Sequence, residues 1–111
     1  MSQSTQRIQL SDEEGLPTAM WFDPSRATMW KEGTRFDGHN HVSLCSGDKF
    51  GHQALYRTAT GRWVLNSWSQ WQGSVETYQL IDARSAAAWF VANEIAEVPE
   101  ELQAFVTEAE V

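Results

Sequence analysis

The segment from residue 53 to residue 82, QALYRTATGRWVLNSWSQWQGSVETYQLID, constrains the fold more than any other stretch of the chain. Apolar and polar residues alternate along it, and turn signals at Thr60-Gly61 and Gln72-Gly73 interrupt the alternation. Alternation with a period of two is typical of strands, and short glycine-containing turns join antiparallel neighbours. The pattern therefore predicts a three-stranded antiparallel sheet, a β-meander.

The middle run of this segment, residues 62 to 70, places apolar side chains on both of its faces. Trp63 and Leu65 occupy odd positions, and Val64 and Trp68 occupy even positions. A strand with one face on a core and the other in water should show a single apolar face. We therefore expect the central strand to be packed on both sides.

The residues before this sheet predict a short helix followed by a loop. Asp23 and Pro24 favour a helix start, with the helix running to about Glu32, because Asp is preferred at the N-cap and Pro at the first helical position. The loop over residues 34 to 51 is rich in Gly, Asn, Asp and Ser, which favour turns. Its short apolar run, residues 41 to 45, suits an extra edge strand.

Two further helices are predicted after the sheet. Asp82 is a candidate N-cap for a helix over residues 83 to 95, whose apolar side chains recur at helical spacing. Pro99 starts a last helix that is amphipathic and acidic. The predicted fold class is thus α+β, a three-stranded antiparallel sheet with helices packed on one face.

The length of 111 residues allows one domain with a thin core. Residues 1 to 16 are polar and acidic without a periodic pattern, which predicts a disordered arm, and residues 17 to 111 then form a single α+β domain ending in the acidic helix. No apolar run is long enough to span a membrane, and the start of the chain lacks the regions of a signal peptide, so we expect a cytoplasmic protein.

The net charge of −7 is concentrated near the two ends of the chain. Between Pro24 and Arg84 there are seven bases and five acids, an excess of two positive charges, and no base follows Arg84. An acidic tail repels phosphate backbones, so nucleic-acid binding is disfavoured.

All three histidines and the only cysteine lie within sixteen residues, between positions 37 and 52. Imidazole, thiolate and carboxylate are zinc ligands, although the spacing matches no standard zinc module. Cysteine with a histidine base is also a candidate nucleophile, whereas buried cysteines are commonly inert. The candidate metal ligands are His39, His41, Cys45 and His52, with Asp37 and Asp48 nearby.

A second candidate surface combines aromatic and basic residues of the sheet. Trp68 lies on the even face of its strand and Trp71 at the strand end, so the two are hard to place in one core. Exposed aromatic residues are common anchors of protein interfaces and can also stack on nucleotide bases; alternatively, they fill the thin core. The candidate partner-binding residues are Arg57, Arg62, Trp68, Trp71 and Tyr78, together with Glu100 and Glu101 of the acidic helix, which suit a basic partner or simply face solvent.

The run LYRTATGRWVLNSWSQWQGSVETYQLIDARSAAAWFVAN, residues 55 to 93, resembles a pattern found in small uncharacterised bacterial proteins: Leu-Tyr-Arg, a glycine turn, a Trp-containing strand and an Ala-Ala-x-Trp helix. The segment FDPSRATMWKEGTRFDGHNHVS, residues 22 to 43, is similar to the part that precedes it in some of them. The resemblance implies a compact β-β-β-α unit and a mobile-element context. It carries no activity and no catalytic residues to transfer.

Taken together, these features favour a small non-enzymatic protein-binding module, such as an inhibitor or antitoxin-like regulator, with a protein partner and no membrane. This interpretation involves no cofactor. One alternative is a small enzyme that uses the loop from 37 to 52, either metal-dependent, with zinc as the candidate metal, or thiol-dependent. Another is a weak single-stranded nucleic-acid binder that uses Arg57, Arg62 and the tryptophans.

Overall fold

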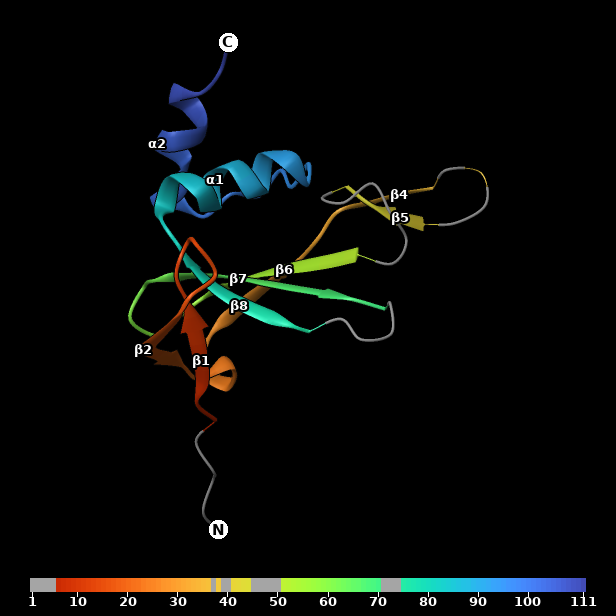
Figure 1. The fold of residues 1–111 in the computed structure, drawn as a ribbon. Coiled ribbons are helices and arrows are strands. Elements are labelled where there is room, and N and C mark those ends of the chain that lie inside the picture. Colours follow the sequence, from red (N-terminus) through yellow and green to blue (C-terminus); the bar gives the residue numbers. More distant parts are fainter. Residues whose placement is uncertain (1–5, 37, 39–40, 45–50, 71–74) are drawn as a thin grey trace.

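A computed structural model describes residues 6–36, 38, 41–44, 51–70 and 75–111 of the chain. These residues form a six-stranded mixed sheet, a two-stranded sheet and two α-helices (Figure 1). The elements are β1 (Ile8–Ser11), β2 (Pro17–Phe22), the 3-10 helix η1 (Pro24–Arg26), β3 (Thr28–Lys31), β4 (Thr34–Phe36), β5 (His41–Ser43), β6 (Gly51–Arg57), β7 (Trp63–Ser69), β8 (Thr77–Ile81), α1 (Ala83–Ala92) and α2 (Glu100–Glu108). The predicted α+β class is confirmed.

The large sheet has the strand order β2-β1-β8-β7-β6-β3. The predicted meander is its centre, because β6 pairs antiparallel with β7, and β7 with β8. Three more strands come from the first third of the chain, and β1 pairs with β8 in parallel. The sheet is therefore six-stranded and mixed, and the prediction of a three-stranded meander was too small.

The helix predicted from Pro24 to Glu32 was wrong. Asp23 does cap a helical turn by accepting a hydrogen bond from the backbone N–H of Ser25, but the turn ends after three residues. The chain then continues as β3, which pairs antiparallel with β6. Pairing with a strand that lies far along the sequence outweighs the local helix signal.

Strand β1 lies within the segment 1 to 16, for which the composition predicted no regular structure. It pairs antiparallel with β2, and Leu10 of β1 is buried. The turn between the two strands is held by Asp12, whose Oδ1 accepts hydrogen bonds from the backbone N–H groups of Glu14 and Leu16. The short strand expected over residues 41 to 45 is present as β5, paired with β4.

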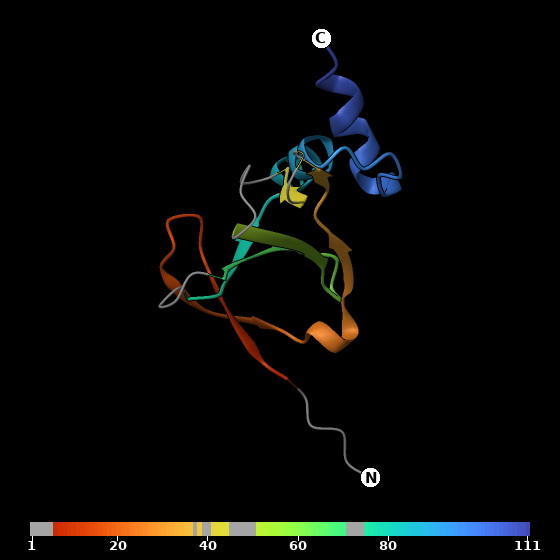
Figure 2. The same cartoon turned by 90° about the vertical axis from the view of Figure 1, so that its right-hand side faces the viewer.

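The sheet is curled, because its two edge strands are joined by a short link. Strands β2 and β3 lie at opposite ends of the sheet, but only residues 23 to 27 separate them in sequence. In a flat sheet, six strands would place the edges about 24 Å apart, whereas so short a link spans at most about 20 Å. The link therefore passes across one face of the sheet, opposite the helices, as Figure 2 shows.

Each face of the sheet carries a core. The helix-side core lies between the sheet and the two helices, and its buried members are Leu55, Trp63, Ala86, Ala87, Trp89, Phe90 and Leu102. The hairpin-side core lies under β1 and β2, and its buried members are Leu10, Phe22 and Val64, with Tyr56, Tyr78 and Leu80 packed against them. Neighbouring residues of β7 thus point into different cores, so the expectation that the central strand is packed on both sides is confirmed.

Both predicted C-terminal helices are present, and both pack on the same face of the sheet (Figure 1). The carboxylate of Asp82 caps α1 by accepting a hydrogen bond from the backbone N–H of Ser85, which keeps the pKa of this carboxyl below its usual value. Helix α2 follows Pro99 and buries Leu102 completely. Neither α1 nor α2 is long and apolar enough to cross a membrane, and the described residues form no other helix that could do so.

The two tyrosines of the hairpin-side core should ionise at a higher pH than an exposed tyrosine. Burial and the nearby Glu76 carboxylate raise the pKa of Tyr56, and burial with a hydrogen bond from its hydroxyl to Glu76 raises the pKa of Tyr78 to about 12. Both values exceed the ordinary value of about 10, so the unfolded chain loses these protons first. The contribution of these two tyrosines to stability should therefore be constant below about pH 10 and be lost as the pH approaches 12.

Phenolate absorbance followed against pH tests this expectation, because the chain has only two tyrosines. The urea-unfolded chain should titrate near the ordinary value and the folded chain well above it. Glu76→Gln should lower the pKa of both tyrosines, because it removes the charge that opposes phenolate formation. Coincident titrations of the folded and unfolded chains would contradict the burial of this pair.

Candidate functional site

The hairpin-side face of the sheet is open at one end. Paired residues two positions apart share a face, so Tyr56 with Val64, Ala54 with Asn66, and His52 with Trp68 form successive rows on this face. Strands β1 and β2 pack over the first row and over Tyr78, which pairs with Asn66 of the second row. Beyond the second row, a pocket of about 410 Å³ remains beside Trp68.

This pocket, called the Trp68 pocket below, is formed by four strands, β3, β4, β6 and β7, and by Glu32 between β3 and β4. Its lining residues are Met29, Lys31, Glu32, Thr34, His52, Gln53, Ala54 and Trp68. The half-buried Trp68 lies against His52, with ring centroids 5.8 Å apart, and Met29 is 45% exposed. The pocket thus presents an aromatic ring from β7 and a flexible thioether from β3, the two strands that flank β6, together with one lysine.

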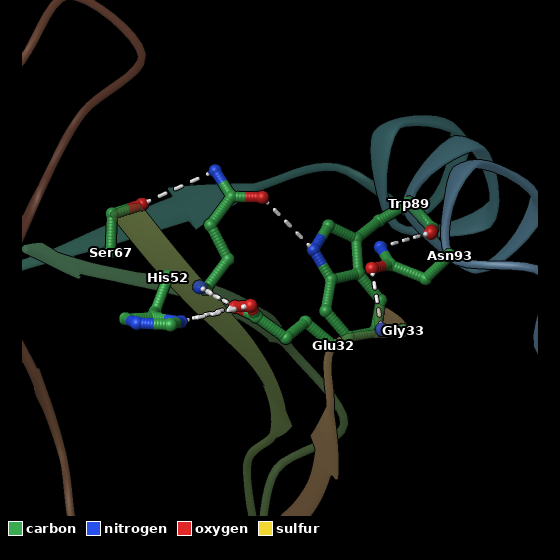
Figure 3. A network of polar contacts seen from close by, with 7 residues as sticks. Glu32, Gly33, His52, Ser67, Trp89 and Asn93 are labelled. Carbon is green, nitrogen blue, oxygen red and sulfur yellow. Dashed lines mark hydrogen bonds and ion pairs between the residues drawn. The ribbon is translucent and has the colours of Figure 1, made fainter. Parts of the chain in front are cut away.

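A nearly buried carboxylate holds one wall of the pocket in place. The side chain of Glu32 is only 9% exposed; it accepts a hydrogen bond from the backbone N–H of Gln53 at 2.8 Å and lies 3.3 Å from Nδ1 of His52 (Figure 3). The other ring nitrogen of His52, Nε2, is buried and has no hydrogen-bond partner among the described residues. An imidazole oriented by a carboxylate can use its second nitrogen to bind or to move a proton.

The same wall is tied to α1 by amide side chains. The Oε1 atom of Gln53 accepts a hydrogen bond from the indole N–H of Trp89 at 3.2 Å, and its Nε2 donates to Ser67 (Figure 3). Farther along, Oδ1 of Asn93 accepts from the backbone N–H of Gly33 at 2.8 Å, while its Nδ2 donates to the carbonyl of Trp89. The pocket wall is therefore fixed to both the sheet and the helix, as a binding site requires.

The residues predicted to bind a partner do not form one surface. Arg57 and Glu101 form an ion pair with each other between β6 and α2. Tyr78 packs against Phe22 and Tyr56 in the hairpin-side core. Each of these three side chains therefore contributes to packing within the chain, although all three keep some exposure.

The remaining predicted partner-binding residues are scattered. Arg62 is exposed and lines two hollows away from Trp68, and Glu100 is exposed in the first turn of α2. Trp71 lies outside the described residues. Trp63, a member of the same aromatic set, is a core residue with 5% exposure. Of the predicted partner-binding residues that the structure describes, only Trp68 lines the pocket.

The predicted zinc site can be followed only in part. His39 and Cys45 lie outside the described residues, as do Asp37 and Asp48. His41 stacks near Phe36 in the small sheet, whereas His52 lies in the large sheet beside Glu32. Within the described ranges, no group of three His, Cys, Asp or Glu side chains is placed to hold a metal ion. The zinc and thiol hypotheses therefore remain predictions.

Reasoning from the sequence missed Met29, Lys31 and Glu32, which form one side of the pocket. They fell within the predicted helix, and a four-residue strand is too short to show a clear period. The pairing of Lys31 with Ala54 brings this side of the pocket to β6. No local signal in the sequence indicates that contact.

No family model, curated protein or solved structure matches the chain. The resemblance to small bacterial proteins therefore remains an expectation. Function has to be argued from the geometry of the described residues.

Proposed function

We propose that this chain is a small non-enzymatic protein-binding module whose docking surface is the Trp68 pocket together with the adjoining edge of β3. The observation that carries the proposal is the pocket itself, which holds a half-buried tryptophan and an exposed methionine on an open sheet face. Aromatic residues and methionine are enriched in protein interfaces, and tryptophan is among the most frequent binding hot spots.

The edge of β3 supports a particular mode of docking. Strand β3 is the last strand of its sheet, and its outer edge has no strand neighbour among the described residues. A free edge offers backbone N–H and C=O groups to an extended segment of another protein. Such a segment would add a strand beside Met29 and Lys31 and place alternate side chains at the pocket.

The charge of the chain suggests the character of the partner. The net charge is −7, and Glu100 is exposed at the start of α2. A partner with a basic surface around an apolar contact would associate faster through electrostatic attraction. An inhibitor or antitoxin-like regulator of such a partner fits this combination of size, acidity and apolar anchor.

The two alternatives have less support. A nucleic-acid binder would need Arg57 and Arg62 beside the exposed aromatic rings, but Arg57 pairs with Glu101, and Arg62 lines other hollows. An enzyme that uses the loop from 37 to 52 has one favourable feature, the imidazole of His52 oriented by Glu32. Lys31 and Thr34 also line the pocket, but neither is hydrogen-bonded to His52, whose Nε2 has no partner among the described residues.

Trp68→Ala should abolish capture of the partner while leaving the chain folded. Affinity purification from the native host with the wild-type chain should retain a protein that is reduced about 10-fold or more with the Trp68→Ala bait. Trp68 is only half-buried, so the loss of stability should stay near 1–2 kcal/mol, below that of a core truncation.

Trp21→Ala is the matched control, because Trp21 is a tryptophan of the edge strand β2, is 48% exposed and does not line the Trp68 pocket. Its bait should retain the same protein as the wild type. Equal capture by all three baits would remove Trp68 from the docking surface. Capture lost in both variants would point to the aromatic content of the chain and not to this pocket.

A further inference from the structure

A second hollow lies at the opposite end of the hairpin-side face. It has a volume of about 240 Å³ and lies where the link between β2 and β3 passes the turn between β6 and β7. Its floor is the hairpin-side core, with Leu10, Phe22 and Leu80, and Trp21 forms one side. This arrangement, called the arginine hollow below, is apolar at the bottom and enclosed by different elements.

Two arginines stand at this hollow in a chain that is otherwise acidic. Arg26 and Arg62 both line it, both are exposed, and neither has an ion-pair partner among the described residues. The only acid that lines the hollow is Asp23, whose Oδ1 already accepts hydrogen bonds from the backbone N–H and the hydroxyl of Ser25. The hollow therefore combines an apolar floor with an excess of positive charge.

The backbone that carries the two arginines is held in place. The N–H of Arg62 donates to the hydroxyl of Thr58 at 3.0 Å, and the N–H of Thr58 donates to the carbonyl of Arg62 at 2.8 Å. On the other side, the N–H of Arg26 donates to the carbonyl of Asp23 at 3.1 Å. A site whose supports are already ordered loses less entropy when a ligand binds.

We propose that the arginine hollow binds a small monocarboxylate with an apolar body, aromatic or branched aliphatic, about the size of 3-phenylpropionate. The planar guanidinium groups match a carboxylate, and the floor of Leu10, Phe22 and Leu80 accepts the apolar body. The volume lies below the range of about 300–1,000 Å³ typical of sites for larger ligands, which selects a single ring or branched chain. A doubly charged, strongly hydrated phosphate does not suit the apolar floor.

The proposal is independent of the Trp68 pocket, which lies farther along the same face. Thr58, at the arginine hollow, and His52, at the Trp68 pocket, flank the covered middle of β6, where Tyr56 belongs to the hairpin-side core. A ligand in the arginine hollow would contact the β2–η1 side and the β6–β7 turn together. Binding should therefore stabilise the curled sheet against unfolding.

Calorimetric titration of the full chain at low salt with 3-phenylpropionate, 4-methylpentanoate and phenylacetate tests the proposal. At least one acid should bind saturably and raise the melting temperature. The matching amide, which keeps the shape without the charge, should bind at least about 10-fold more weakly, since a hydrogen bond to a charged group is worth about that much. Acetate, which keeps the charge without the apolar body, should also bind at least about 10-fold more weakly, because it buries little apolar surface on the floor of the hollow. Arg62→Gln and Arg26→Gln should each weaken binding by about 10-fold.

Arg35→Gln is the matched control, because Arg35 is an exposed arginine on β4 that does not line the hollow. It should leave the affinity unchanged. The proposal is overturned if none of the three acids binds, if acid and amide bind equally, or if the Arg62 and Arg26 variants bind like the wild type. A peptide that ends in phenylalanine and binds more tightly than the free acids would also overturn it, because the hollow would then recognise a protein terminus. None of these outcomes depends on capture by Trp68.

Discussion

Phe90→Ala should lower the free energy of unfolding by about 3–5 kcal/mol, the usual cost of removing a large buried ring. Phe90 has no exposed surface, and its ring makes edge contacts with Trp30 at 5.4 Å and Trp89 at 5.6 Å between centroids, and also with Trp63. Trp30 and Trp63 belong to the sheet and Phe90 to α1. Truncation leaves a cavity at the point where helix and sheet meet.

Urea unfolding of the variant measures this loss, and the neighbouring Val91 supplies the control. Val91 lies in the same helix but is 56% exposed, so Val91→Ala should change stability by no more than about 0.5 kcal/mol. The total free energy of unfolding of such a domain is about 5–15 kcal/mol, so the Phe90→Ala variant should be only marginally stable. A loss below about 1 kcal/mol would mean that α1 is not docked on the sheet through this residue.

The parts of the fold that the sequence predicted correctly are those specified by neighbours in the chain. Strands β6, β7 and β8 follow one another with short connections, and alternation within each one signals the strand. The turn after Arg57 contains Gly61 at φ 85°, a conformation that glycine adopts readily. The helix start at Asp82 likewise depends on a capping bond three residues away. Each of these signals is local, so a window of the sequence is enough to detect it.

Strands β1 and β3 were missed, and each of them pairs with a strand that is distant in sequence. Thr28 pairs with Arg57, and Ser11 of β1 pairs with Gln79 of β8. Strands of four residues show too little alternation to be distinguished from loop or helix. Strand β1 is stabilised by the burial of Leu10 in the hairpin-side core. This core forms only once the sheet has curled.

The candidate site, like the fold, could be predicted from the sequence only in part. The alternation of β7 placed Trp68 on the even face, and there it lies in the row formed with His52. The other side of the pocket comes from β3 and from Glu32, which depend on the distant pairing. Another contact between distant segments brings Glu101 of α2 to Arg57 of β6. Both residues were predicted to bind a partner, but they form an ion pair with each other.

The curl of the sheet connects the two proposed sites. The crossing from β2 to β3 holds Phe22, the last residue of β2, over the middle of the hairpin-side face. A hollow then remains at each end of that face, one beside Trp68 and one beside Arg62. Because one short crossing creates both hollows, a change that loosens the crossing should weaken both sites, whereas a substitution within one hollow should spare the other.

Gly33→Ala should lower the free energy of unfolding by about 3 kcal/mol, at the upper end of the usual cost of overpacking. A Cβ atom at this position would lie 2.8 Å from Cδ1 of Leu44 and even closer to the backbone carbonyl oxygen of Asn93. Gly33 cannot easily shift, because its N–H donates to Oδ1 of Asn93 and its carbonyl accepts from the N–H of Leu44. Either the end of β3 or the end of α1 has to move.

Gly15→Ala separates this clash from the general effect of adding a side chain to glycine. Gly15 has φ 83° and no atom within 4 Å of its would-be Cβ, so its substitution should cost only the roughly 1–2 kcal/mol of a left-handed backbone. Because Gly33 follows Glu32 directly, Gly33→Ala should also weaken capture of the partner at the Trp68 pocket, which Gly15→Ala should leave intact. Equal losses of stability for the two variants in urea unfolding would show that β3 and the end of α1 are not in close contact. That result would also contradict the inference that the pocket wall is fixed to α1.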